Sequence, residues 1–148
     1  MRVIEHPEVN DFERALLDAL LAGPLDILAT LREQITSARV VLRELSGAGF
    51  FLKFEVSPST RRVEPANFEI SDVYFDLEGT EHGGGSVLFI RDGVVTTLEG
   101  YSHAGGWPDE PRQFRLYYFD GPTRNMPKVA AEIASRAALS RNLRHDGL

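Results

Sequence analysis

The sequence predicts an α+β domain with two N-terminal helices, a largely antiparallel sheet of five or six strands, and a C-terminal helix. Apolar residues recur every fourth position near the N-terminus, and they alternate with polar residues in the middle of the chain. The turns between the alternating segments are too short to contain crossover helices. A chain of 148 residues with 43% hydrophobic side chains suits a single globular domain, residues 1–148.

The first helix is predicted to follow Asn10, whose side chain can cap it, with Glu13 three residues on as in a capping box. Its apolar face is formed by residues four apart: Phe12, Leu16 and Leu20. Gly23 and the proline after it end this helix and allow a second one over residues 25–35. Residues 1–9 are expected to be frayed.

Alternating apolar and polar residues, with turn residues between them, predict the strands. The segments are 39–45, 50–56, 68–77, 87–91, 94–98 and 113–119. Within 68–77 the apolar phase switches, which indicates a bulge or break near Asp72. Asp92 and Gly93 form the strongest hairpin signal in the chain, because both turn positions need a positive φ.

The C-terminal helix is predicted to open at Pro127. Its small-residue face consists of Ala130, Ile133, Ala134 and Ala137. This face can pack on the sheet or on a second copy of the chain, so a homodimer stays open. Residues 141–148 are expected to be frayed.

Charge and composition exclude several classes of protein. The net charge is −6, and residues 64–110 contain ten acidic side chains against one basic side chain, Arg91. A surface of this sign repels phosphates, so direct nucleic-acid binding is disfavoured. The acidic excess is either a solvated face or a surface that docks a basic partner.

No targeting or membrane signal is visible in the chain. No apolar stretch reaches the roughly 18 residues of a membrane-spanning helix, and the first residues do not resemble a signal peptide. The sequence contains no cysteine, which excludes a disulfide scaffold and thiolate chemistry. We therefore expect a soluble, cytoplasmic protein without membrane attachment.

Two glycine-containing motifs imitate a serine hydrolase. His82 and the glycines after it resemble an esterase oxyanion loop, and residues 100–104 around Ser102 resemble a nucleophile elbow. An elbow needs a helix after the serine, and the glycines and proline that follow Ser102 cannot begin one. We interpret the triple glycine as a tight turn or as a strand that a neighbour approaches closely.

A metal or enzymatic site is the second hypothesis. The hairpin could bring His82 and His103 together, with Glu81, Glu99 or Asp109 as a further ligand, and imidazole with carboxylate suits zinc or iron. No paired ligand spacing supports this site, and a strand carboxylate such as Glu99 commonly meets an arginine, here Arg91 or Arg115. We expect no cofactor.

The loop that follows the last hairpin is the preferred interaction surface. It carries the aromatic side chains Tyr101, His103 and Trp107, with an acidic rim of Glu99, Asp109 and Glu110. Tryptophan and tyrosine are common at the centre of protein interfaces. Trp107 could instead cap the open end of the core.

A set of short motifs resembles a group of small bacterial proteins with no known activity. The motifs are GAGFF at 47–51, EG at 78–79, HG at 82–83, LFIRDG at 88–93, LEGY at 98–101 and WP at 107–108. The likeness covers about residues 45–119, and small acidic proteins of this type are similar in character to immunity proteins that neutralise toxins. We therefore expect a non-catalytic protein-interaction module, immunity-like or regulatory, that binds a basic protein partner. The alternative is a small enzyme or metal-binding protein around His82, Glu99 and His103.

Overall fold

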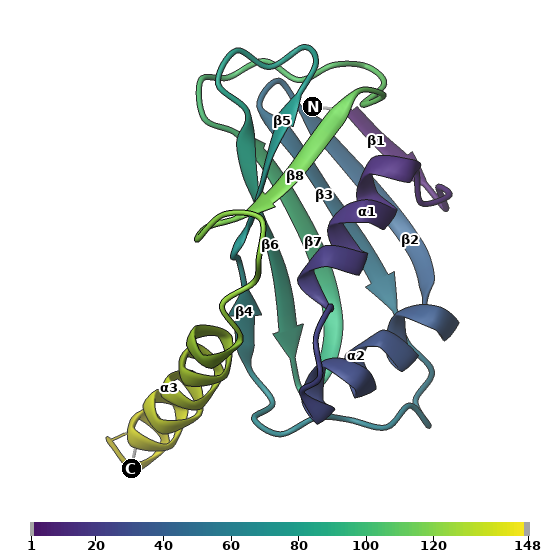
Figure 1. Ribbon diagram of the computed structural model, residues 1–148. Helices are drawn as coiled ribbons and strands as arrows, with labels where there is room; N and C mark the ends of the chain where they lie inside the picture. Colours follow the sequence, from purple (N-terminus) through teal and green to yellow (C-terminus); the bar gives the residue numbers. More distant parts are fainter. Residues whose placement is uncertain (1, 147–148) are drawn as a thin grey trace.

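A computed structural model describes the backbone of residues 2–146 and the side chains of residues 2–136 (Figure 1). The three helices are α1 (Asp11–Leu20), α2 (Asp26–Ser37) and α3 (Met126–Asp146). The eight strands are β1 (Arg2–Glu5), β2 (Arg39–Ser46), β3 (Gly49–Glu55), β4 (Phe68–Ile70), β5 (Val73–Leu77), β6 (Gly84–Arg91), β7 (Val94–Ser102) and β8 (Phe114–Tyr118).

The strands form one antiparallel sheet in the order β1-β2-β3-β7-β6-β5-β8, with β4 also paired to β6. The α+β class and the placement of the helices are confirmed, but the sheet has eight strands and not five or six. Two differences explain the count. Residues 1–9 were expected to be frayed, whereas Arg2–Glu5 pairs with β2 as an edge strand. The predicted strand 68–77 is two strands, β4 and β5.

The predicted helix cap at Asn10 and the predicted hairpin turn at Asp92 are both present. The Asn10 side chain accepts a hydrogen bond from the Glu13 backbone N–H at 2.8 Å, and the Glu13 carboxylate accepts one from the Asn10 N–H at 3.0 Å. Asp92 and Gly93 both have positive φ, 53° and 79°, as the hairpin between β6 and β7 requires.

The predicted break near Asp72 is confirmed, and a partly buried ion pair is formed there. Asp72 lies between β4 and β5, and the Arg124 guanidinium donates to its two carboxylate oxygens at 2.9 Å each. Arg124 also donates to the Ala22 carbonyl at 2.6 Å, which links the break to the segment just after α1. After the break, β5 pairs with β8, whereas β4 before the break pairs only with β6.

Both N-terminal helices pack on one face of the sheet, α1 against β5, β6 and β8 and α2 against β7. The sheet bends around α1, so that the helix lies between β8 and the strands β1 and β2 (Figure 1). Phe12 is fully buried at the centre, with its ring 5.0 Å from that of Phe75 and 5.1 Å from that of Phe114. Strands β3 to β7 therefore bury alternate residues on the helix side, whereas β1, β2 and β8 have only exposed or half-buried residues.

Helix α3 covers the outer edge of β4 with its first turns and then extends past the sheet (Figure 1). Among its described side chains, Val129 and Ile133 are buried, whereas Ala134 of the predicted small-residue face is exposed and Ala137 lies outside the described side chains. Of the segment expected to be frayed, residues 141–146 belong to α3, and residues 147–148 lie outside the described part. No described helix combines the length and the hydropathy that a bilayer crossing needs.

Candidate functional site

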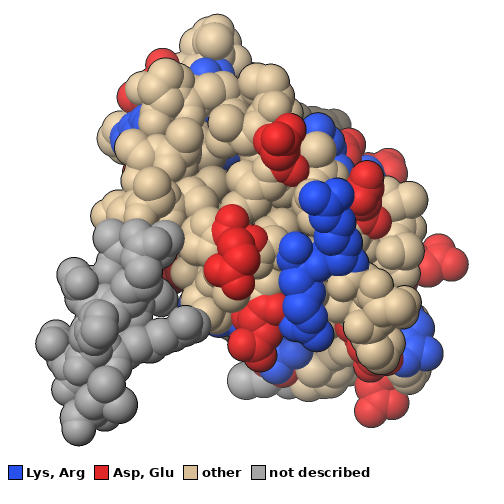
Figure 2. All heavy atoms as spheres, turned by 90° about the horizontal axis from the view of Figure 1, so that it is seen from below, with Lys and Arg blue, Asp and Glu red and all other residues tan. Residues whose placement is uncertain are grey.

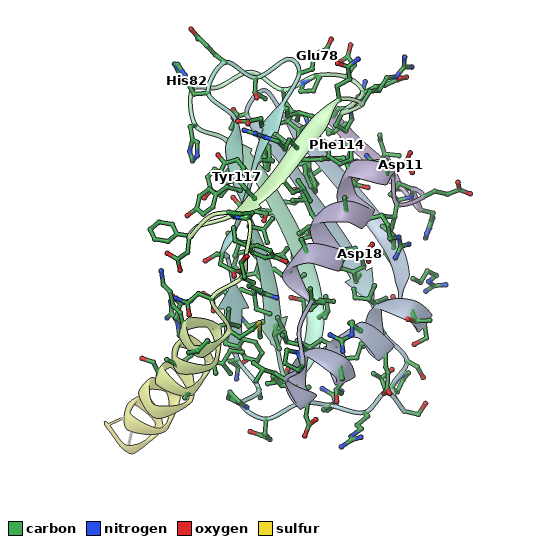
Figure 3. The ribbon with its side chains drawn as sticks, viewed as in Figure 1. Asp11, Asp18, Glu78, His82, Phe114 and Tyr117 are labelled. Carbon is green, nitrogen blue, oxygen red and sulfur yellow. The ribbon has the colours of Figure 1, made fainter. Side chains whose placement is uncertain are left out.

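The sheet face opposite α1 and α2, here called the open face, has no described helix packed across it. It displays the alternate residues that the strands turn away from the core, and many of them are aromatic: Phe51, Tyr74, Phe89, Tyr101 and Tyr117, with Phe119 just after β8. Phe51 is 39% exposed and Phe119 is 63% exposed. Figure 3 shows the two sides of β8: Phe114 lies toward α1, and Tyr117 lies on the other side.

Five of the rings on this side form an aromatic row (Tyr101, His103, Tyr74, Tyr117 and Phe119). Tyr101 meets His103 edge-on, with ring centroids 5.8 Å apart. His103 stacks on Tyr74 at 6.2 Å, and Tyr74 lies 6.2 Å from both Tyr117 and Phe119. The row crosses four neighbouring strands, β7, β6, β5 and β8, and so brings residues far apart in the sequence onto one surface.

Glycine residues at the start of β6 make room for these rings. A Cβ atom on Gly85 would lie 2.7 Å from Cζ of Tyr101 and 3.2 Å from Cδ1 of Tyr74, so both rings lie over this residue. On the core side, a Cβ on Gly84 would lie 2.8 Å from Cζ of Phe75. The interpretation of the triple glycine as a site of close approach is confirmed.

The hydrolase-like motif has the wrong structure for a nucleophile. Ser102 is the last residue of β7, and a bend follows it where an elbow would have a helix. Its Oγ is buried and has no hydrogen-bond partner among the described residues. The serine of a nucleophile elbow instead presents its hydroxyl at an accessible strand-to-helix turn.

The basic side chains of the open face are already paired with acids of the same face. These pairs are Arg39–Glu55 at 2.6 Å, Lys53–Glu44 at 3.3 Å, Arg91–Glu69 at 3.3 Å and Arg115–Asp76 at 2.7 Å. Arg91 and Arg115, the partners expected for Glu99, therefore bind other carboxylates. Within the described part of the chain, no ion pair or hydrogen bond engages the Glu99 carboxylate.

Glu99 lies in the middle of the open face between two apolar neighbours. Phe51 of β3 stands directly opposite on one side, and Val87 of β6 on the other. Partial burial among these side chains raises the pKa of Glu99 above its ordinary value of 4.5. Burial also raises the pKa of Tyr101, and Tyr74 and Glu99 add smaller effects in the same direction. No described side chain supplies a cation that would stabilise an ionised carboxylate at this position.

Replacing Glu99 by glutamine should raise the melting temperature at neutral pH. Because folding raises the pKa of this acid, its ionisation costs stability as the pH rises from 4.5 through the folded-state pKa. The gain of Glu99→Gln should therefore disappear at about pH 4, where both states are largely protonated. Thermal melts at the two pH values measure this difference. Asp18→Asn on the exposed side of α1 is the control, and a glutamine variant less stable at neutral pH contradicts the prediction.

Trp107 lies on the helix side of the sheet and not on the open face. Its ring centroid is 5.6 Å from that of Phe50, 5.8 Å from that of Phe75 and 6.0 Å from that of Phe12. The side chain is half-buried against the core. Trp107 therefore caps the open end of the core, which was the alternative interpretation of this residue.

The predicted acidic rim does not come together around Trp107. Asp109 lines a small hollow of about 70 Å³ beside Trp107, on the helix side. Glu110 forms an ion pair with Arg112, and Glu99 is on the open face. Of the predicted surface, the structure groups Glu99, Tyr101 and His103, and it separates Trp107, Asp109 and Glu110 from them.

The three residues of the hypothetical metal site do not form a cluster of ligands in the described part of the chain. His82 is exposed in the loop before β6, in an open groove that it shares with Glu78 and Glu81 (Figure 3). His103 instead stacks in the aromatic row. Among the residues described by the structure, no three His, Asp or Glu side chains are grouped closely enough to hold a metal ion.

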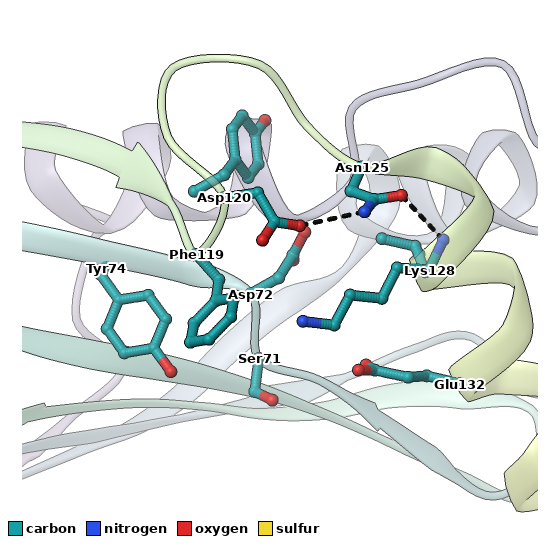
Figure 4. A pocket seen from close by; sticks show the side chains of 10 residues that line it. Ser71, Asp72, Tyr74, Phe119, Asp120, Asn125, Lys128 and Glu132 are labelled. Atoms are coloured by element: carbon teal, nitrogen blue, oxygen red, sulfur yellow. Dashed lines mark hydrogen bonds between the residues drawn. The ribbon is translucent and has the colours of Figure 1, made fainter.

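A cavity of about 180 Å³ lies at the far end of the aromatic row, between the β4–β5 break, β8 and the start of α3 (Figure 4). Tyr74 and Phe119 belong both to the row and to the cavity wall. The Lys128 ammonium lies 4.1 Å from the centre of the Phe119 ring. Sequence patterns do not reveal this cavity, because its walls come from three segments that meet only after the sheet breaks at Asp72.

Surface charge is mixed on the end of the molecule seen from below. Lysine and arginine side chains form a streak there, with acidic side chains on both sides of it (Figure 2). The net charge of −6 is therefore not collected into one acidic patch on that end. On the open face, the excess negative charge in mid-sheet comes from Glu99.

Comparisons with protein-family models, with curated proteins and with solved structures find no match to this chain. The resemblance over residues 45–119 therefore brings no named relative. What the protein does must follow from the geometry of its own residues.

Proposed function

We propose that the protein is a non-catalytic binding module whose open face holds a basic protein partner. The observation that carries this proposal is Glu99, a carboxylate that pairs with no cation among the described residues and is set among exposed aromatic rings on the open face. An immunity-like or regulatory protein acts in this way, by contact with its target. A cytoplasmic location, which the cysteine-free sequence suits, is part of the proposal.

The aromatic residues supply the apolar part of such an interface. Phe51 and Phe119 expose 39% and 63% of their surface, and the aromatic row continues between β7 and β8. Large exposed apolar areas on a sheet face are costly in water and mark interaction sites. Aromatic anchors dominate the binding energy of protein interfaces, because they bury a large area with few rotatable bonds.

The charges of the open face favour a basic partner over an acidic one. Four basic side chains of this face are neutralised by four acids, which leaves Glu99 as the unbalanced charge in mid-sheet. The net charge of −6 adds a long-range attraction for basic proteins. Binding should therefore weaken as salt is added.

Affinity capture from cells with two charge-reversed variants tests the proposal. Glu99→Lys inverts the charge on the open face, and Asp18→Lys makes the same change on the exposed side of α1. A basic protein should be captured by the wild type and by Asp18→Lys. Glu99→Lys should lose it by at least about tenfold in affinity, as charge reversal at a buried interface position does.

The captured protein is then purified, and its dissociation constant is measured against each variant at two salt concentrations. Equal affinity for wild type and Glu99→Lys would place the interface elsewhere on the molecule. Loss of binding in Asp18→Lys alone would show that the interface lies on the helix side of the sheet. Either result contradicts the proposal.

A further inference from the structure

We infer that Glu99 and Phe51 form a receptor for one arginine side chain of the partner, and that lysine does not replace it. This inference rests on the proposed function and deepens it. It names the chemical group that the open face recognises, which is a guanidinium placed between a carboxylate and an aromatic ring.

The open face already contains one filled site of this kind. Glu69 of β4 stands directly opposite Phe89 of β6. Arg91 fills the pair: its guanidinium lies 3.3 Å from the Glu69 carboxylate and 5.4 Å from the centre of the Phe89 ring. A planar guanidinium can bind a carboxylate and lie over a ring at the same time.

The same pair occurs a second time on this face, without the arginine. Glu99 of β7 stands directly opposite Phe51 of β3, as Glu69 stands opposite Phe89. Residues directly opposite in an antiparallel pair have side chains close enough to touch a common third group. The pair of Glu99 and Phe51 therefore presents a carboxylate and an aromatic ring side by side, as Glu69 and Phe89 do.

Lys53 is the residue of this chain that could bind Glu99 as Arg91 binds Glu69, but it binds another carboxylate. Lys53 follows Phe51 by two residues, as Arg91 follows Phe89, but its ammonium pairs with Glu44 at 3.3 Å. Lysine carries a compact charge that satisfies one carboxylate and does not spread over a ring as a guanidinium does. Glu99 keeps both carboxylate oxygens available for the two parallel hydrogen bonds that arginine donates.

Neighbouring residues make this second site a suitable place for a partner's side chain. Tyr101, two residues beyond Glu99 on the same strand, begins the aromatic row on the same face. Phe51 is exposed, and it lines a shallow hollow that also contains Phe89 and Arg91. An arginine stacked on Phe51 lies beside the Glu99 carboxylate, which stands directly opposite that ring, while Glu44 and Lys53, which pair with each other, also line the hollow.

Titration with two peptides of equal charge, amidated hexa-arginine and hexa-lysine, tests the inference. We expect hexa-arginine to bind the wild type about fivefold more tightly, since one added guanidinium–ring contact contributes about 1 kcal/mol. Glu99→Gln and Phe51→Leu should each lower the affinity for hexa-arginine to that for hexa-lysine. Asp18→Asn, which removes the same charge from α1, should keep the fivefold preference.

The outcomes separate this inference from the proposed function. If both peptides bind equally and both lose affinity in Glu99→Gln, the face takes basic partners without selecting arginine, and the inference is overturned. If neither peptide depends on Glu99, the receptor is absent, and the proposed function loses its main support as well. Circular dichroism of each variant confirms that the fold is retained.

Discussion

Replacing Arg43 by alanine is expected to lower the free energy of unfolding by about 3–5 kcal/mol. The Glu13 side chain beneath it is only 2% exposed, and Arg43 donates to its two carboxylate oxygens at 2.8 Å and 2.6 Å. Arg43 also donates to the Glu8 carbonyl at 2.6 Å. Without the guanidinium, the buried carboxylate loses its main partner.

The matched control is Arg39→Ala, which breaks a pair of the same type on the surface. Arg39 and Glu55 are 66% and 60% exposed, so this change should cost less than about 1 kcal/mol. Urea denaturation of both variants measures the difference. Equal losses in the two variants would show that burial of Glu13 does not decide the energy of its pair.

Replacing Phe12 by alanine should cost about 3–5 kcal/mol of unfolding free energy. Phe12 is fully buried, and its ring meets those of Phe75, Phe114 and Trp107 at centroid distances of 5.0, 5.1 and 6.0 Å. The cavity left by the ring should also admit water toward Trp107. The chain contains a single tryptophan, so a red shift of its emission reports this change directly.

Phe51→Ala is the control for the core substitution, because it removes the same side chain from the open face. Phe51 is 39% exposed, so its truncation should cost about 1 kcal/mol or less and leave the Trp107 emission unchanged. An unchanged emission in Phe12→Ala would contradict the placement of Trp107 against the core.

Sequence patterns predict the elements that depend on interactions between residues close together in the chain. The capping box at Asn10 and the hairpin at Asp92 depend on residues within four positions of each other, so their signals are legible in the chain. Strand β1 has no such signal. Its residues are exposed or half-buried, and it is a strand because β2 pairs with it from about 40 positions away.

The candidate site was predictable along one strand and not across strands. Glu99, Tyr101 and His103 alternate along one strand direction, and they do share a face. Phe51 and Tyr74 join them through the register of the sheet, which local patterns do not contain. Trp107 does not lie on the predicted surface, because its loop returns to the core side of the sheet. There its ring packs against those of Phe12 and Phe50.

Fluorine NMR of the protein labelled with 3-fluorotyrosine, titrated with the captured partner, tests the open face most directly. The chain has four tyrosines: Tyr74, Tyr101 and Tyr117 on the open face, and Tyr118 on the helix side, where its hydroxyl donates to the Ala19 carbonyl at 2.9 Å. Binding at the open face should shift the first three resonances and leave that of Tyr118 in place. A shift of Tyr118 alone, or no shift of the other three at saturation, would contradict the proposed binding surface.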